Sequence, residues 1–409
     1  MLASRDTIVT LERAGASTPA YVYDLDGIEA EAASLRGAFG DRPHGVFYAV
    51  KANSAGSIVR ALASRGCGAD VVTGAELLLA LACGVAPEQV VFSGVAKSDE
   101  ELDLAVGRGI GAIQIESIEE IARVDARARA QGRVARVAIR VNPGLDFEEL
   151  ATHAHVATGH DEAKFGVAKA DLEHALAAVG AAKNVALVGL SSHVGSQFFR
   201  TAPYVTAARV ACELVRGLRS RFSLEFVDTG GGFGVDYAGG ETARPADFVR
   251  ETLAVMRETG VGDLALHVEP GRALVARHAV LVARVIQRKV SPSSGDRWLM
   301  IDAGMNDLIR PALYQAKHRV VAIGGEGEAR PWRVVGPCCE SADDFGAHAL
   351  PDGGFDHVAL LDAGAYGYTM ASRYNGRALA SEVFLRGGAV VSVSPRAPMG
   401  AWAEERARV

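Results

Sequence analysis

Eight short apolar runs recur along the first two thirds of the chain, and most are continuous rather than alternating. They are Val46–Val50, Ala69–Val72, Val90–Ser93, Ala112–Ile115, Arg136–Val141, Leu187–His193, Glu225–Asp228 and Leu264–Val268. Continuous apolar runs of this length are typical of parallel strands that are buried on both faces. Helical segments separate the runs, and three of these open with Ser or Thr followed three residues later by Glu, at Thr73, Ser98 and Ser117. That spacing predicts capping boxes.

The alternation of eight strands with seven helical segments predicts an α/β fold, a (β/α)₈ barrel over residues 27–275. A doubly wound open sheet is the alternative, and it is disfavoured because no Gly-x-Gly-x-x-Gly follows the first strand. After residue 276 the strand-like runs are separated by Gly, Pro and Asp turns instead of helices. These runs are Val280–Val290, Trp298–Asp302, Val320–Ile323, Trp332–Val335, Val358–Asp362 and Ala389–Val393. We therefore expect a mostly antiparallel β domain, a barrel or sandwich, built from residues 1–26 and 276–409 and including a strand at Ala20–Tyr23.

Composition narrows the class of protein. At 409 residues the chain is longer than one hydrophobic core usually accommodates, so two domains are expected. The net charge of -6 is mild and spread out, which argues against a nucleic-acid partner. No apolar run of about 18 residues predicts a membrane span, and the N-terminus lacks the apolar core of a signal peptide. The five cysteines form no Cys-x-x-Cys pair, so we expect no disulfide framework, no metal site and a cytoplasmic location.

Reactive side chains follow several of the predicted barrel strands. Lys51 ends the first strand, His193 ends the sixth, Thr229–Gly234 follows the seventh and Glu269 follows the eighth. Active sites of α/β barrels lie at the carboxyl ends of the strands. These groups are therefore expected to converge on one face.

Each of these groups also has a plain structural interpretation. Lys51 would be a solvated rim lysine, or, if buried, an amine nucleophile toward carbonyls. Three consecutive glycines mark a tight turn, or a loop whose N–H groups bind phosphate. Glu269 would be a solvated carboxylate, or the partner of a pyridine nitrogen. His193 would be a structural histidine, or a flat ring that stacks on a cofactor.

Four motifs that contain these residues resemble those of the fold-type III pyridoxal-phosphate decarboxylases. They are Tyr48-Ala-Val-Lys-Ala-Asn53, His193-Val-Gly-Ser-Gln197, Gly230-Gly-Gly232 and Glu269-Pro-Gly-Arg272. Further segments are similar to the diaminopimelate decarboxylase family within that group: Thr152-His153, Thr158-Gly159, Lys164-Phe-Gly166, Asn306-Asp-Leu-Ile-Arg-Pro-Ala-Leu-Tyr314, Cys339-Glu-Ser-Ala-Asp343, Gly364-Ala-Tyr366 and Met370-Ala-Ser372. The likeness covers nearly the whole chain in one motif order.

The resemblance implies an alanine-racemase-like barrel that binds pyridoxal 5'-phosphate and a β domain that completes the active site. It implies decarboxylation of meso-2,6-diaminopimelate to L-lysine and CO₂, the last step of lysine biosynthesis, by a homodimer with shared active sites. Lys51 would form a Schiff base with the cofactor, and Lys51, His193 and Cys339 would be catalytic, with Cys339 donating a proton. The remaining cofactor contacts would be Gly230, Gly231, Gly232, Glu269, Gly271, Arg272 and Tyr366. Substrate would be bound by Arg272, Arg310, Tyr314, Glu340 and Tyr366.

The chain departs from the family pattern in two places. Residues 147–150 resemble a small insertion before Thr152-His153, and Gly376-Arg-Ala-Leu-Ala380 replaces a proline-rich stretch after Asn375. The insertion lies near a loop that normally helps to close the site, so it bears on substrate entry. The replacement removes prolines, which bears on local rigidity.

Other functions remain as alternatives. A sibling decarboxylase would act on ornithine, arginine or a carrier-bound amino acid. Glu340, directly after Cys339, is the residue that separates these alternatives, because a carboxylate there suits a substrate whose reacting end, or distal end, carries an ammonium group. A racemase is disfavoured by the Cys-Glu-Ser loop, which suits one-way proton delivery. From a different class, a catalytically silent cofactor-binding regulator would lack the reaction altogether.

Overall fold

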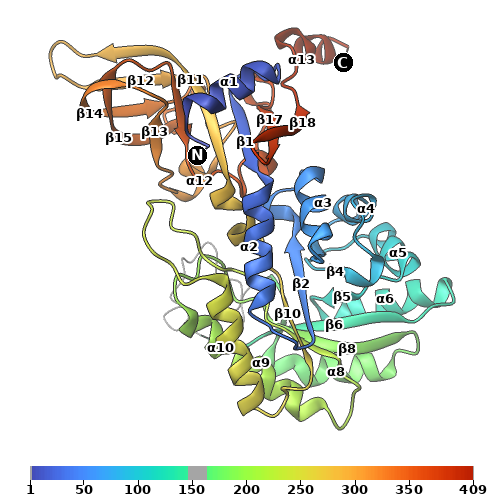
Figure 1. Cartoon of the computed structure of the whole chain (residues 1–409). Helices are drawn as coiled ribbons and strands as arrows, with labels where there is room; N and C mark the ends of the chain where they lie inside the picture. The colour runs from blue at the N-terminus through green and yellow to red at the C-terminus, as the bar shows by residue number, and fades with distance from the viewer. Residues whose placement is uncertain (1, 146–163, 409) are drawn as a thin grey trace. The chain divides into compact units, whose positions relative to one another are not determined.

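The computed structural model describes residues 2–145 and 164–408. The chain divides into two compact units, which are described separately (Figure 1). The barrel unit comprises Glu29–Val235 and Glu241–Ala273, and the second unit comprises Met1–Ile28, Asp236–Gly240 and Leu274–Val409. The segment Asp236–Gly240, which follows the glycine run, therefore belongs to the second unit even though barrel residues flank it in the sequence.

The barrel unit contains a closed parallel sheet, which confirms the predicted (β/α)₈ architecture. Its strands are β2 (His44–Ala49), β3 (Gly68–Val71), β4 (Val90–Phe92), β5 (Ala112–Ile115), β6 (Ala135–Asn142), β8 (Val185–Ser191), β9 (Phe226–Asp228) and β10 (Ala265–Val268). The order β5-β4-β3-β2-β10-β9-β8-β6 closes through the pairing of β5 with β6. A two-residue strand, β7 (Val167–Ala168), extends the sheet beside β6.

Helices lie outside these strands (Figure 1). They are α2 (Leu25–Gly37), which precedes β2, and α3 (Gly56–Ser64), α4 (Gly74–Ala82), α5 (Asp99–Arg108), α6 (Ile118–Ala130), α8 (Leu172–Ala181), α9 (Thr201–Leu218), α10 (Pro245–Glu258) and the four-residue α11 (Arg272–Val275). Inside the barrel, one apolar side chain from each of several strands joins a packed cluster, which includes Phe47, Val91, Ala138 and Phe226. This core fixes the strand register, because a slip by one residue would turn each side chain to the other face.

The capping predictions were confirmed in part. The Ser98 hydroxyl accepts the Glu101 N–H and the Glu101 carboxylate accepts the Ser98 N–H, which is a complete capping box at α5. Thr73 caps α4 through its hydroxyl, but the Glu76 carboxylate accepts the N–H of Val72 instead. At α6 the Ser117 hydroxyl accepts the Glu120 N–H, but the Glu120 carboxylate accepts the N–H of Glu116 and pairs with Lys97. The prediction of a reciprocal box was therefore wrong at Thr73 and Ser117. In both cases the glutamate carboxylate accepts a different backbone N–H, which would otherwise lack a hydrogen bond.

The second unit contains a nine-stranded, mostly antiparallel sheet, as predicted. Its strands are β1 (Ala20–Asp24), β11 (Ala279–Val290), β12 (Arg297–Ile301), β13 (Val320–Ala322), β14 (Glu326–Val335), β15 (Asp344–Gly353), β16 (His357–Leu360), β17 (Ser381–Arg386) and β18 (Ala389–Ser394). Strand β1 lies between β11, to which it is antiparallel, and β17, to which it is parallel, so Val22 packs between Val280 and Val383. The predicted N-terminal strand is therefore central to this sheet.

Three helices accompany this sheet: α1 (Arg5–Arg13), α12 (Arg310–Tyr314) and α13 (Met399–Arg406). Gly376, in the segment that departs from the family pattern, has φ +70° and lies so close to Trp402 of α13 that a Cβ there would be 2.9 Å from the indole. The segment that departs from the family pattern is therefore packed closely against α13. Within residues 2–145 and 164–408, no helix has the length and apolar character needed to cross a bilayer.

Candidate active site

The candidate residues of the barrel unit follow four strands that are neighbours in the barrel. In the order β2-β10-β9-β8, Lys51 lies in a 3₁₀ turn (Val50–Ala52) after β2, and Glu269 follows β10 directly. The run Gly230–Gly232 follows β9, and His193 follows β8. The carboxyl ends of parallel neighbouring strands lie at the same edge, so these groups share one face of the barrel, as predicted.

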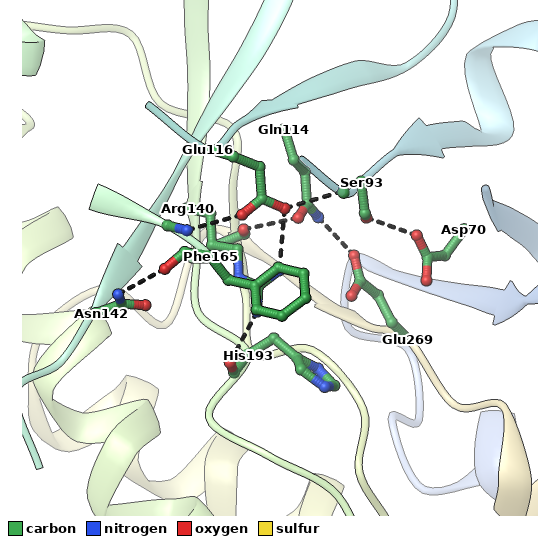
Figure 2. Close-up of polar contacts among 12 residues, drawn as sticks. Asp70, Ser93, Gln114, Glu116, Arg140, Asn142, Phe165, His193 and Glu269 are labelled. Atoms are coloured by element: carbon green, nitrogen blue, oxygen red, sulfur yellow. Dashed lines mark hydrogen bonds and ion pairs between the residues drawn. The ribbon is translucent and has the colours of Figure 1, made fainter. Parts of the chain in front are cut away.

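The Lys51 amine is held by a carboxylate. Its Nζ lies 2.6 Å from Oδ2 of Asp70, which lies on β3 next to β2 and is completely buried. The Ser93 hydroxyl donates a hydrogen bond to the other oxygen of Asp70, as Figure 2 shows. The Lys51 side chain is 37% exposed. The side chain is therefore half-buried, between the solvated and the buried interpretations, and the ion pair with a buried carboxylate holds the amine at the carboxyl end of the strands.

Glu269 lies in a buried polar network that also contains Asp228. The Gln114 side chain, from β5, donates a hydrogen bond to Glu269 (Figure 2). It also donates to Asp228 at 3.3 Å, while its oxygen accepts the Ser191 hydroxyl at 3.0 Å. Burial raises the pKa of Glu269 well above its usual range, and the carboxyls of Asp228 and Asp70 raise it further. Like charges in a low dielectric cannot all ionise together. Glu269 therefore retains a proton to higher pH than a solvated glutamate, which contradicts its interpretation as a solvated carboxylate.

The imidazole of His193 is neutral. Burial lowers its pKa well below the usual value, and the charges of Arg140 and Lys51 lower it further. The N–H of Gly231 donates to Nδ1 at 3.2 Å, so the proton of the ring is on Nε2. Arg140 fixes the backbone here, because it donates to the His193 carbonyl at 3.2 Å and pairs with buried Glu116 at 3.0 Å (Figure 2).

The glycine loop brings its backbone closer to neighbouring strands than a side chain would allow. Gly230 and Gly232 have φ of +69° and +93°, and a Cβ on Gly231 would lie 2.0 Å from the Glu269 carbonyl oxygen. Gly271 lies in a less tight position, with its Cβ position 3.0 Å from the methyl groups of Ala49 and Ala52. The Gly230 N–H donates to Asp228 at 2.8 Å and the Gly231 N–H donates to His193, so an anion beside this run would be bound through the Gly232 N–H rather than through all three. The loop itself is free of side chains. Its geometry fits the phosphate of a cofactor.

Arg272 begins α11 and donates to the Ser196 hydroxyl at 3.3 Å. Each of these groups matches one part of pyridoxal phosphate. The lysine amine matches its aldehyde, and the proton-retaining carboxyl matches its ring nitrogen. The neutral flat ring matches the face of the pyridine, and the glycine loop matches the phosphate. The residues present at this end of the barrel therefore fit that cofactor.

The other candidates belong to the second unit. Arg310 is 4% exposed, and Tyr314, four residues later on α12, is exposed. Tyr366 adopts φ +55° in the turn after β16. The structure thus brings Lys51, His193, Gly230–Gly232, Glu269, Gly271 and Arg272 together within the barrel unit, and it assigns Arg310, Tyr314, Cys339, Glu340 and Tyr366 to the second unit.

The loop after β14 contains the two adjacent cysteines. Cys338 is buried, and its N–H donates to Asp343 Oδ2 at 2.6 Å, while Cys339 is exposed and its N–H donates to Asn375 at 3.3 Å. The carboxylate of Glu340 accepts the hydroxyl of Tyr374. Cys339 and Glu340 are therefore presented at the surface of a loop that Asp343 anchors.

Some expected segments lie outside the described residues, namely the 147–150 insertion, Thr152-His153 and Thr158-Gly159. The neighbouring Lys164-Phe-Gly166 is described. The N–H of Gly166 donates to Glu116 at 2.8 Å, and the Phe165 ring lies 4.9 Å from the Arg140 guanidinium. This motif therefore joins the polar network behind His193.

Sequence reasoning missed several residues of the site: Asp70, Gln114, Glu116, Arg140 and Asp228. Each is buried, and all except Glu116, which directly follows its strand, lie within a barrel strand. Buried polar side chains need hydrogen-bonding partners, so a lone glutamine in Ala-Ile-Gln-Ile was a usable signal.

A cavity of about 640 Å³ lies at the opposite, amino-terminal end of the barrel strands. Its walls include Phe47, Phe226 and His267, together with Arg136 and Glu225, which pair with each other through hydrogen bonds of 2.9 and 2.7 Å. Burial lowers the pKa of His267 to about 3, so this ring is neutral. The reactive groups lie at the other end of the strands, and we assign the chemistry there.

Comparison with known proteins identifies relatives of the whole chain. Residues 25–276 match the family model described as pyridoxal-dependent decarboxylase, pyridoxal binding domain. The chain is 37% identical to a diaminopimelate decarboxylase of Zymomonas mobilis, over 90% of this chain and 88% of that protein. It is 38% identical to one from Pseudomonas fluorescens, over 93% and 90%. A crystal structure of diaminopimelate decarboxylase from Helicobacter pylori complexed with L-lysine superposes with a TM-score of 0.89 at 34% identity, covering 96% of this chain and 98% of that one.

Proposed function

The chain belongs to the diaminopimelate decarboxylases, a family of pyridoxal-dependent enzymes, and we propose that it converts meso-2,6-diaminopimelate to L-lysine and CO₂ in lysine biosynthesis. The observation that carries this proposal is the face formed by Lys51, Glu269, His193 and the glycine loop, which fits pyridoxal phosphate. Similarity to diaminopimelate decarboxylases along nearly the whole chain supports the choice of substrate.

The barrel residues would hold the cofactor. When bound, pyridoxal phosphate withdraws electrons from the carbon that loses CO₂. Lys51 would anchor its aldehyde carbon, the backbone of Gly230–Gly232 and Gly271 would line the phosphate with help from Arg272, and Tyr366 would contact the cofactor. Glu269, whose raised pKa favours the protonated carboxyl, would share its proton with the ring nitrogen. The neutral ring of His193 would stack on the cofactor face, because a flat uncharged ring packs there without repelling a protonated pyridine.

Substrate binding would fall to charged groups that complement the two ends of the molecule. We propose that Arg272 and Arg310 bind the distal carboxylate, since a guanidinium grips a carboxylate through two parallel N–H donors. Glu340 would pair with an ammonium group, and Tyr314 and Tyr366 would line the substrate. Cys339 would donate a proton to the carbon after CO₂ departs, which requires the exposed thiol that the loop presents.

From the resemblance to the diaminopimelate decarboxylase family we propose a homodimer in which Cys339 of the partner subunit serves the barrel of the first. A biosynthetic enzyme with free cysteines fits a reducing compartment, so we propose a cytoplasmic location.

Release of CO₂ from a panel of amino acids tests the proposed reaction. With pyridoxal phosphate supplied, we expect release from meso-diaminopimelate, with L-lysine as the product by chromatography. Lysine, ornithine and arginine should be slower by about a hundredfold or more, because each lacks the distal carboxylate and would leave the anchoring guanidinium groups without a partner. Faster release from ornithine or lysine would assign the chain to a sibling activity, and absence of release from the whole panel would support a silent cofactor-binding protein.

A further inference from the structure

Arg310 is held in a small buried cluster of the second unit. Its Nη1 lies 2.7 Å from Nε2 of His318, which is 1% exposed. Its guanidinium carbon lies 4.0 Å from the centre of the Tyr237 ring. The Tyr237 and His318 rings are themselves 4.5 Å apart at 48°. Nδ1 of His318 lies 2.9 Å from the carbonyl oxygen of Leu361, which follows β16.

These contacts determine the protonation of His318. A guanidinium has only donors, so Nε2 must accept the Arg310 N–H and therefore carries no proton. A backbone carbonyl has only lone pairs, so Nδ1 must donate to Leu361 and therefore carries the proton. His318 is accordingly a neutral ring in a single tautomer.

We propose that His318 is a positioning residue that holds the Arg310 guanidinium in the orientation in which it binds the distal carboxylate of the substrate. The inference rests on the proposed function, because it takes Arg310 as a substrate-binding group. His318 fixes one N–H of the guanidinium and Tyr237 covers one of its faces, so both the plane and the direction of the guanidinium are set. Bidentate recognition depends on that plane, and a freely rotating arginine would lose order each time substrate bound.

Two substitutions separate this role from a general structural one. In His318→Gln the amide oxygen reaches the position of Nε2 and still accepts the Arg310 N–H. In His318→Asn the shorter amide reaches only the position of Nδ1, so it keeps the bond to Leu361 and loses the bond to Arg310. We expect His318→Asn to raise KM for meso-diaminopimelate about tenfold or more with kcat changed less, the range for a lost hydrogen bond to a charged group. We expect His318→Gln to stay within about threefold of wild type in KM.

A double-mutant cycle tests whether the effect passes through Arg310. In an Arg310→Met background, His318→Asn should raise KM by less than about twofold further, since residues that act through one contact are not additive. Equal kinetics for the two His318 variants, or an undiminished effect of His318→Asn in the Arg310→Met background, would overturn the inference. Wild-type failure on every amino acid of the panel would instead overturn the proposed function and, with it, the substrate assignment of Arg310.

A measurement that does not depend on turnover tests the arrangement itself. Long-range ¹H–¹⁵N correlation spectra of the holoenzyme, with the His318 signals assigned by their loss in His318→Asn, should show a protonated Nδ1 and an unprotonated Nε2. In Arg310→Met the Nε2 signal should shift, because its donor has gone. A protonated Nε2 in the wild-type protein would overturn the inference even if the enzyme proved fully active.

Discussion

Lys51 and Asp70 form an ion pair at the carboxyl end of adjacent strands, and the proposed chemistry depends on the lysine amine. Lys51→Ala should lower turnover by at least about a thousandfold, because the cofactor loses its covalent anchor. Release of CO₂ measures the loss, and peptide mapping after borohydride reduction should find the cofactor adduct on Lys51. Lys183→Ala, at an exposed lysine of the same unit, is the matched control and should retain wild-type turnover. An adduct on another lysine of the wild-type protein would refute the assignment.

Asp307 is a buried carboxyl three residues before Arg310, and burial raises its pKa to about 6 from a usual value of 3.8. The folded state therefore binds more protons than the unfolded state between these pH values, so this group's stabilising contribution is full below about 3.8 and is lost as pH rises to about 6. Asp307→Asn stays neutral and, through its amide oxygen, still accepts the Gly304 N–H.

We expect the free energy of unfolding of wild type, relative to Asp307→Asn, to fall by about 2 kcal/mol between pH 4.5 and 7.5. Denaturant titrations of both proteins at the two pH values measure the difference. The comparison with the variant cancels groups of the opposite sign, such as His267, whose lowered pKa makes stability rise with pH. A difference that is constant with pH, or one that increases, would contradict the assignment.

At the scale of elements, the loop between β9 and α10 depends on a side chain being absent at Gly231. A Cβ there would lie 2.0 Å from the Glu269 carbonyl oxygen, so either this loop or the end of β10 must move. We expect Gly231→Ala to destabilise the protein by about 1–3 kcal/mol, the usual cost of overpacking, and to weaken cofactor binding. Thermal unfolding and a cofactor titration followed by absorbance measure both effects.

Gly217→Ala is the matched control for this prediction. Gly217 is an exposed helical residue of α9 with no atom within 4 Å of its Cβ position. Ala in a helix is favoured over Gly by about 0.5–1 kcal/mol, so this variant should be neutral or stabilising and should bind cofactor as wild type does. A Gly231→Ala protein that behaved like Gly217→Ala would show that the close approach is not needed.

Strands that alternate with helical segments were predictable, and two strands of the second unit were missed. The eight barrel strands are short continuous apolar runs, and each was found within a few residues of its predicted bounds. Strand β15 was missed because its sequence contains Gly346, Pro351 and two Asp residues that are typical of turns, although Pro351 pairs opposite Ala329 in the β14–β15 hairpin. Strand β17 was missed although Val-Phe-Leu lies at its centre, because its apolar run is only three residues long and polar residues flank it on both sides.

The candidate site was predictable to the extent that motifs mark strand ends. Lys51, His193 and Glu269 were found there because a reactive residue directly after an apolar run stands out. Gln114 and His318 were not, because their roles come from hydrogen bonds to residues 155 and 8 positions away in the chain, respectively. The sequence marks Gln114 as a polar residue in an apolar strand, but the partners of both residues depend on tertiary packing, which no local pattern encodes.

At the scale of the whole molecule, the candidate residues are divided between two units. Those expected to hold the cofactor lie mainly in the barrel unit, and the substrate-binding and proton-donating candidates lie mainly in the second unit. The residue proposed to anchor the cofactor and the residue proposed to deliver the proton therefore lie in different units. This division makes the proposed homodimer open to a direct test by mixing inactive proteins.

Lys51→Ala and Cys339→Ala should each be inactive or nearly so as separate homodimers. If Cys339 of the partner subunit serves each barrel, a mixed dimer has one site that lacks both groups and one intact site. Random exchange of equal amounts makes half the dimers mixed, so activity should recover to about a quarter of wild type. The measurement is CO₂ release after subunit exchange, with native mass spectrometry to quantify the mixed dimer. If both residues served the same site within one chain, every site in the mixture would lack one of them, and proven mixed dimers would show no recovery.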